Sequence, residues 1–251
     1  MLRVIVRTFL TVFPRGSAFL AHYSLESPIL GLVASTGPDS LRYPGDWLRQ
    51  RVVDSKLSEK LSLIRLDNRY ELFGCFVACN KGLTAFAGKE PLNTDDDPIV
   101  TFGAPRFIYG KKQPACGRLF ELLHGFHPRP EDIIADPVSE EDRQFQLRLA
   151  SYWGARNEFL MAGVGVPRTN DPEELLKSVR EPLLAVVRTS PDFMAAYKPL
   201  LAIAYSLSRT DPRASEELLR DLEKANPEYD EARRLRLRLC AEGSLASRDH
   251  N

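Results

Sequence analysis

Acidic residues cluster in the middle of the chain, where the sequence reads PLNTDDDP. Asn93, Asp95 and Asp97 alternate like the first ligands of an EF-hand calcium loop, which also needs a Gly at its sixth position and a Glu at its twelfth. Pro98 and Ala104 occupy those positions here, so an EF-hand is excluded. Asn and Asp side chains commonly accept hydrogen bonds from nearby backbone N–H groups. The residues alone therefore predict a polar turn that orders the strand expected after it.

Two cysteines and two histidines raise a second possibility, a zinc site. Structural zinc sites combine closely spaced Cys pairs with His pairs that are several residues apart. Here only two residues separate His124 from His127, and Cys75 and Cys79 fall on the apolar face of a predicted helix. Buried thiols behave as small apolar side chains. The sequence therefore favours core positions for the cysteines and loop positions for the histidines over a zinc site.

The glycines of GVGVPR, at 163–168, are spaced like the start of a dinucleotide-binding loop. That fingerprint needs a third glycine, a preceding strand and a following helix. Arg168 stands at the third-glycine position after Pro167, and a helical pattern precedes the segment, which indicates a loop between helices. No Ser–His–Asp or Cys–His grouping has support in the sequence. The residues alone therefore predict no catalytic, cofactor-binding or metal-binding residue.

A row of arginines near the C-terminus, Arg233, Arg234, Arg236 and Arg238, has the composition of a nucleic-acid contact. The whole chain, however, has 34 Lys plus Arg and 34 Asp plus Glu, and its net charge is zero. It lacks the basic excess that marks nucleic-acid-binding domains. Cations near a helix C-terminus also interact favourably with the helix dipole and need no ligand. We therefore expect a solvated helix face and no nucleic-acid partner.

Composition is that of an ordinary globular chain, with 251 residues of which 43% are hydrophobic and 27% charged. No apolar run approaches the ~20 residues that span a bilayer, so no membrane span is predicted. Pro14, Arg15 and Gly16 interrupt the apolar N-terminus, which argues against a secretory signal, because the core of such a signal is unbroken. The four cysteines are irregularly spaced and do not suggest a disulfide scaffold. We expect a cytoplasmic protein.

The elements that must position these residues begin with an amphipathic pattern at 3–13, which Pro14 and Gly16 end. The apolar runs at 17–24 and 27–35 predict two adjacent strands joined by a short connection.

The middle of the chain changes period. From 46 to 88 the pattern is helical, and one helix face is predicted to carry Leu72, Cys75, Phe76 and Cys79. Residues 99–107 read as a strand. Residues 110–140 are rich in Pro and Gly, as linkers are, with one short helix predicted at 118–126.

The last third is predicted to be all helical. Ser139 and the acids after it suit a helix start. Two segments, TSPDFMAAY and ANPEYDEAR, match in outline, and their prolines, Pro191 and Pro227, lie 36 residues apart, near the tetratricopeptide period of ~34 residues. This region therefore resembles about one and a half to two degenerate tetratricopeptide repeats. The helices are predicted at about 140–162, 172–189, 192–208, 212–225 and 228–241.

Two stretches resemble the spermidine synthase-like (aminopropyltransferase) family. VIVRTFLTVFPRGSAFLAHYSLESPILGLVAS is similar to the family's helix ending in Phe-Pro and the two strands after it. ELFGCFVACNKGLTAFAGKEPLNTDDDPIVTFGAPRFIY is similar to a downstream stretch that carries an NTDD-x-P turn and an Ala-Pro-Arg. The resemblance covers about residues 1–110. Its motif positions, for which we expect a structural role, are Asn93, Thr94, Asp95, Asp96, Pro98, Ala104, Pro105 and Arg106.

The resemblance implies an α+β, mostly helical chain: the C-terminal edge (a helix plus a strand hairpin) of a Rossmann-like, methyltransferase-type domain, then an all-α tetratricopeptide-like region. The expected bounds are 1–110 for the family segment, 111–138 for a linker, 139–243 for the helical domain and 244–251 for a disordered tail.

The family's Gly-rich loop, ribose-binding acid and catalytic aspartate have no counterpart in this sequence, so we expect no cofactor and no catalysis by this chain alone. Two alternatives stay open. One is a protein-interaction module that binds a partner through the helical region. The other is a transferase completed by a separate catalytic chain.

Overall fold

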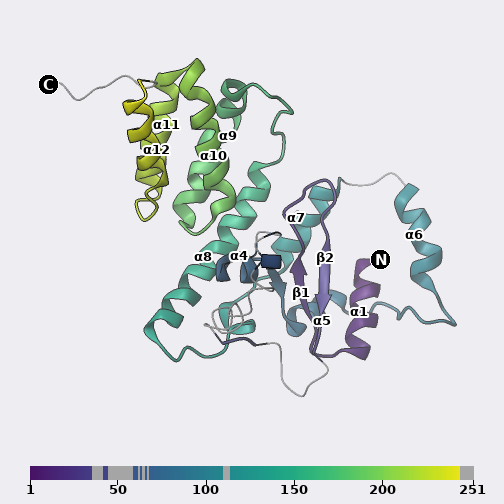
Figure 1. Cartoon of the computed structure of the whole chain (residues 1–251). Coiled ribbons are helices and arrows are strands. Elements are labelled where there is room, and N and C mark those ends of the chain that lie inside the picture. The colour runs from purple at the N-terminus through teal and green to yellow at the C-terminus, as the bar shows by residue number, and fades with distance from the viewer. Residues whose placement is uncertain are drawn as a thin grey trace. The chain divides into compact units, whose positions relative to one another are not determined.

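The structure of the chain is a computed structural model that describes residues 1–35, 42–44, 59–61, 63, 66, 68–109 and 114–243. The chain divides into two compact units, Met1–Ala150 and Ser151–Asn251 (Figure 1). Within the described part of the chain, no helix is long and apolar enough to cross a membrane. The predicted helices between 46 and 67 and the predicted tail at 244–251 lie largely or wholly outside the described residues. The predicted domain bounds remain predictions.

The first unit starts with a helix and a strand hairpin, as the sequence predicts. The helix α1 (Leu2–Val12) buries Val4 and Val6. After Pro14 the strands β1 (Ser17–Leu20) and β2 (Leu30–Val33) pair in antiparallel fashion.

A third strand completes the sheet where the sequence predicts a helix. β3 (Phe76–Ala78) pairs antiparallel with the other side of β1, so the strand order is β2-β1-β3. The predicted helix face that carries Leu72, Cys75, Phe76 and Cys79 is therefore wrong, because α4 (Arg69–Gly74) ends before this strand. All three residues of β3 are buried, and a short, fully buried strand has no alternation that separates it from a helix by period.

The segment after β3 holds a second correction. α5 (Asn80–Ala87) packs on α1 and ends at Gly88, whose φ of 59° lies in the left-handed region that glycine tolerates. The predicted strand at 99–107 is wrong, because Ile99–Tyr109 form the helix α6. The polar turn before α6 lies as predicted, and its side chains start this helix instead of a strand.

Residues 114–138, predicted as linker around one short helix, contribute to the core. α7 (Ala115–Gly125) confirms the short helix and buries Leu119 and Leu123. A single 3₁₀ turn (Pro130–Asp132) follows, and Ile133 and Ile134 are fully buried after it.

The long helix α8 (Glu140–Ala162) is confirmed and begins with a side-chain cap. The backbone N–H of Asp142 donates to Ser139 Oγ over 3.1 Å, and Asp142 Oδ2 accepts from the N–H of Val138 over 3.2 Å. In the first unit, the fully buried Phe145 packs against Tyr70 and Phe73 beside α4. Residues of α8 from Ser151 onward belong to the second unit.

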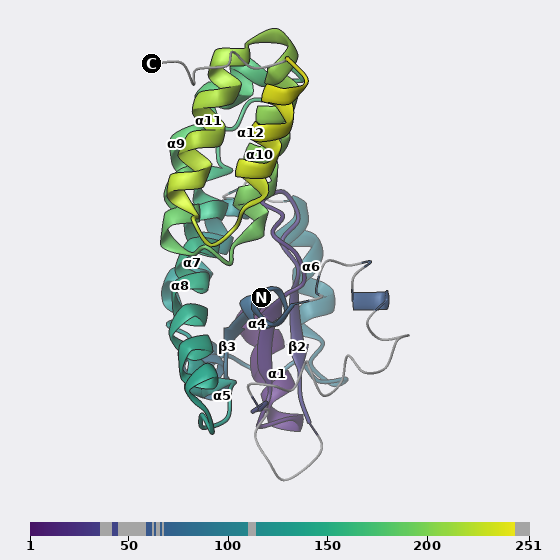
Figure 2. The same cartoon turned by 60° about the vertical axis from the view of Figure 1, so that its left-hand side comes forward.

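The second unit is an array of helices, and its predicted helices are confirmed within a few residues. Figures 1 and 2 show the last four lying side by side. The segment at 163–168 is a loop between helices, as predicted, with Gly165 at a φ of 81°. The helices after it are α9 (Pro172–Thr189), α10 (Met194–Thr210), α11 (Pro212–Ala225) and α12 (Glu231–Ala241).

Candidate functional site

The residues of the NTDD-x-P turn build the start of α6. Asn93 Oδ1 accepts the backbone N–H of Val100 over 2.8 Å, and Thr94 Oγ1 accepts that of Asp97 over 3.0 Å. The backbone N–H of Asn93 donates to Thr8 Oγ1 on α1 over 2.8 Å. Each bond satisfies a backbone donor or fixes the turn to α1, so the geometry is that of a structural turn.

The remaining motif residues lie on the turn and on α6. Asp95 and Asp96 are exposed, while Ala104, Pro105 and Arg106 lie on α6, the last two exposed. None of the eight motif residues lines the hollow that lies beside β2 or the one that lies beside Cys79. In the part of the chain that the structure describes, no group of three or more His, Cys, Asp or Glu side chains is placed to hold a metal ion.

The open edge of β2 offers backbone hydrogen-bonding groups. Among the described residues, β2 pairs only with β1. The N–H of Ala21 donates to Ile29 O over 3.0 Å, and bonded and non-bonded residues alternate along an antiparallel ladder. Gly31 therefore bonds toward β1, whereas Leu30 and Leu32 direct their N–H and C=O groups to the open side. At the opposite side of the sheet, every residue of β3 is buried.

An apolar groove, here called the edge groove, adjoins this strand. Its volume is about 480 Å³. It lies between the sheet face that carries Leu20 and Leu30, the first turns of α1 and one side of α7. Glu26 at one wall and Arg118 at another are its charged members. Exposed apolar side chains surround the same strand, since Ile29 is 52% and Val33 42% exposed. The edge groove and the open edge together can take up a further strand with its side chains.

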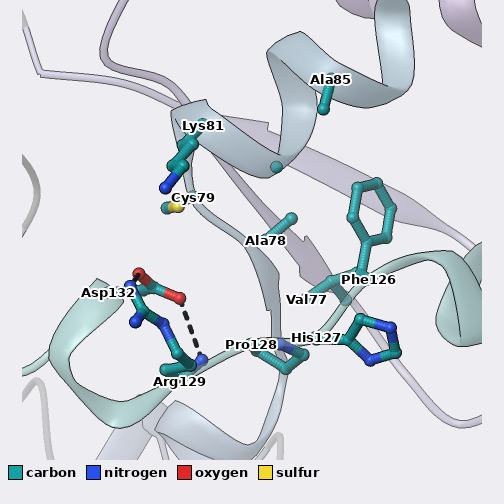
Figure 3. Close-up of a pocket in the computed structure, with 11 residues that line it drawn as sticks. Val77, Ala78, Cys79, Lys81, Ala85, Phe126, His127, Pro128, Arg129 and Asp132 are labelled. Carbon is teal, nitrogen blue, oxygen red and sulfur yellow. Dashed lines mark hydrogen bonds and ion pairs between the residues drawn. The ribbon is translucent and has the colours of Figure 1, made fainter.

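A second hollow, here called the Cys79 pocket, lies between β3, the start of α5 and the segment after α7 (Figure 3). Its volume is about 360 Å³. Cys79 stands at the N-terminal end of α5 without a side-chain capping bond, and Figure 3 shows Lys81 beside it. Arg129 on the opposite wall is engaged locally, because its backbone N–H donates to Asp132 Oδ2 over 2.9 Å and its guanidinium pairs with Glu131 over 3.2 Å.

Only two of the four residues considered for a zinc site line the Cys79 pocket. Cys79 and His127 line it, but the buried Cys75 donates its S–H to Glu71 O over 3.4 Å, and His124 is exposed on α7. The pocket lining therefore includes one thiol, one lysine amine and one imidazole. Among the described residues, no hydrogen bond pairs the Cys79 thiol, as a nucleophile, with Lys81 or His127 as a base.

Two hydrogen bonds in the helical array each link residues that lie 35 positions apart. Asn226 Nδ2 donates to Pro191 O over 2.8 Å, which joins the two matching loops. The N–H of Ala232, in the first turn of α12, donates to the hydroxyl of Tyr197 on α10 over 3.0 Å. Burial raises the pKa of the Tyr197 phenol above 10.0, so the hydroxyl stays neutral at ordinary pH and can accept this bond.

The arginine row on α12 is only partly neutralised. Arg236 reaches Glu223 on α11 over 2.7 Å, and this hydrogen bond raises the pKa of its guanidinium. Arg234 pairs with Asp230 over 2.6 Å. Arg233 and Arg238 are exposed. Two of the four arginines therefore form the ion pairs described, and the other two are exposed to solvent.

Comparison of the chain with models of protein families, with curated proteins and with solved structures finds no match in any of the three.

Sequence reasoning missed the edge groove. One of its walls comes from α7, in a segment read as linker, and the groove exists only once α1, the hairpin and α7 meet. The available signal was the period of RLFELL, which places Leu119, Leu122 and Leu123 along one side of a helix.

Proposed function

We propose that the chain is the C-terminal part of a spermidine synthase-like protein, catalytically inactive alone, which completes a larger sheet through the open edge of β2. This edge is the observation that carries the proposal. Among the residues that the structure describes, Leu30 and Leu32 have no ladder partner on that side, which adjoins an apolar groove. An exposed apolar strand edge is normally covered or paired in a native protein, because it otherwise promotes aggregation.

The occupant that fits the family resemblance is a strand of an adenosyl-binding domain. The resemblance expects a helix followed by two strands at the end of a Rossmann-like sheet, and α1, β1 and β2 occur in that order. Such a domain supplies its adenosyl site at the carboxyl ends of parallel strands, whereas the described sheet has only antiparallel pairs. The same proposal includes a cytoplasmic location, which suits the four free thiols.

Activity of the chain alone provides the first test. We expect calorimetric titration with decarboxylated S-adenosylmethionine to give no saturable binding, and assays to give no spermidine. Micromolar binding by the chain itself would contradict the proposal.

Strand addition provides the second test, by mixing the chain with a separately produced adenosyl-binding half of a spermidine synthase-like protein. We expect a complex that Leu32→Pro weakens by at least about tenfold, because proline removes an N–H that points to the open edge. Leu32→Ala is the matched control, since it shortens the same side chain and keeps the N–H. Equal affinity of the two variants, or no complex with the parent chain, would exclude this use of the edge.

We propose a second function for the second unit, a tetratricopeptide-like protein-interaction module. The supporting observation is the pair of bonds Asn226–Pro191 and Ala232–Tyr197, each of which spans 35 positions. Helix pairs that repeat in this way stack into arrays whose exposed helix faces bind partner segments. The test is retention of partner proteins on the immobilised full chain, with α10 and α12 as the expected contact. Substitutions on those helices that change no retained protein would exclude it.

A further inference from the structure

We propose that the face shared by α10 and α12 binds an extended acidic segment of a protein partner that also carries apolar side chains. The inference deepens the interaction function proposed for the second unit and rests on it. The face, called here the cationic face, comprises Lys198, Leu201 and Tyr205 on α10 with Arg234 and Arg238 on α12.

A shallow hollow marks the middle of the cationic face. Its volume is about 310 Å³, and its lining consists of Leu201 from α10 with Glu231, Arg234, Leu235 and Arg238 from α12. The two leucines supply the apolar part of this lining. Lys198 and Tyr205 lie one helical turn to either side of Leu201 on α10, and Tyr205 is 54% exposed. The hollow can therefore hold an apolar side chain while cations flank the chain that bears it.

The distribution of charge between helices identifies the partner as acidic. α10 contains two cations and no acid, and α12 contains four arginines and one acid, Glu231. α11, which packs against both of them, contains four acids and three cations. Positive charge is thus concentrated on α10 and α12, although the whole chain is neutral. Complementary potentials of this kind select partners of opposite sign.

Ion pairs within the chain leave part of this positive charge available to a ligand. Arg236 is engaged with Glu223, so it ties α12 to α11 and is unavailable to a ligand. Arg234 is held by Asp230, and both side chains are well exposed, at 73% and 58%. Exposed pairs of this kind are weak, so Arg234 can exchange its partner for a ligand carboxylate. Arg238 is exposed, and guanidinium groups bind carboxylates through two parallel hydrogen bonds.

The experiment measures fluorescence anisotropy with the full chain and three short labelled peptides at low ionic strength. One alternates Glu with Leu, one replaces each Glu by Gln, and one replaces each Glu by Lys. We expect saturable binding of the Glu peptide alone, weakening as salt is added because screening reduces exposed charge interactions. The double variant Arg234→Glu/Arg238→Glu should weaken it at least about tenfold. The control Arg213→Glu/Lys224→Glu makes the same charge change on α11 and should leave the affinity within about twofold of the parent.

The outcomes separate this inference from the function on which it rests. Far-UV circular dichroism checks that each variant is folded, and Arg238→Ala replaces the double variant if that one is not. Equal binding of the Glu and Lys peptides, equal loss in both double variants, or no binding of the Glu peptide would overturn the acidic partner. Saturable binding of the Gln peptide that Leu201→Asp abolishes would keep an interaction module but overturn its acidic selectivity. Tighter binding of single-stranded RNA than of the Glu peptide would also overturn the inference.

Discussion

The two compact units differ in how far apart in sequence the residues joined by their internal hydrogen bonds lie. In the second unit, two of the bonds that join its loops and helices span the same separation, 35 positions, namely Asn226–Pro191 and Ala232–Tyr197. In the first, bonds of unrelated range tie the chain together, since Asn93 bonds Thr8 across 85 positions and Arg42 bonds Asp136 across 94. The helices of the second unit could be predicted from local sequence signals, whereas the fold of the first depends on which distant segments meet.

The largest effect is expected from removing one core aromatic in each unit. Phe193 and Phe76 are fully buried. Phe193 packs against Tyr152 and Phe159 in the second unit, and Phe76 packs against Phe19 in the first. Replacement of either by Ala should lower the free energy of unfolding by about 3–5 kcal/mol.

Native-state hydrogen exchange locates this loss. We expect Phe193→Ala to reduce protection in α9–α11 and Phe76→Ala to reduce it in the sheet, because each side chain supports its own unit. Loss of protection throughout the chain in both variants would break the comparison, since the two units would then unfold as one.

A smaller effect is expected at the bond between Tyr197 and Ala232. Tyr197→Phe leaves a buried N–H without its acceptor and should cost about 1–3 kcal/mol. Tyr205→Phe is the control, because Tyr205 is 54% exposed and should change the free energy of unfolding by less than about 0.5 kcal/mol. Denaturant unfolding measures both. Equal effects would remove the repeat spacing as a source of stability.

The same phenol gives a pH dependence. Burial raises the pKa of Tyr197 above its unfolded value of 10.0. As pH rises through this value, the unfolded chain loses the proton while the folded chain keeps it, so the free energy of unfolding falls. Stability from this group is complete below pH 10.0 and is lost as pH passes the folded pKa. Tyr197→Phe should flatten this alkaline decline relative to the parent, which urea titrations across that range would reveal.

Sequence predicted the second unit well because its signals are local. Asp171 caps α9 by accepting the N–H of Glu173 over 2.9 Å, and Asp211 caps α11 by accepting the N–H of Ala214 over 3.0 Å, as Asp side chains do at helix starts. The helices predicted to begin after these residues have bounds within a few residues of the observed ones. The wrong predictions both lie in the first unit. Residues 76–78 and 99–107 are short apolar runs, whose period does not distinguish a helix from a strand. Burial against the sheet makes the first a strand, and the hydrogen bond that Asn93 accepts at its start helps to make the second a helix.

The candidate sites were harder to predict than the helices. The polar turn was anticipated from the bonding habits of Asn and Asp, although Asn93 and Thr94 supply the observed bonds and Asp95 supplies none that starts α6. The edge groove joins three segments that are far apart in sequence, so no local pattern reports it. The cationic face needed only helix bounds and charges, yet the neutral total hid it, because acids elsewhere in the chain offset the positive charge of α10 and α12.

The polar turn gives the next prediction, in the first unit. Asn93→Ala removes the acceptor for the N–H of Val100 and should cost about 0.5–2 kcal/mol, the usual value of a helix-start cap. Asp95→Ala, two positions away and exposed, should stay within about 0.5 kcal/mol. Thermal unfolding with and without calcium compares them. A larger loss for Asp95→Ala, or a parent melting temperature that rises with calcium, would indicate that the acids bind a metal ion.

The smallest effect separates tertiary from local pairing within α12. Arg236 and Glu223 keep only 22% and 25% of their side chains exposed and join two helices, whereas Arg234 and Asp230 are exposed and four positions apart in sequence. Arg236→Ala should cost up to about 1 kcal/mol, and Arg234→Ala about 0.3–0.5 kcal/mol or less. A double-mutant cycle with Glu223→Ala isolates the coupling of the first pair. If that coupling is no larger than the one between Arg234 and Asp230, the attachment of α12 to α11 comes from its buried Leu235 and Leu239 and the arginine row contributes charge alone.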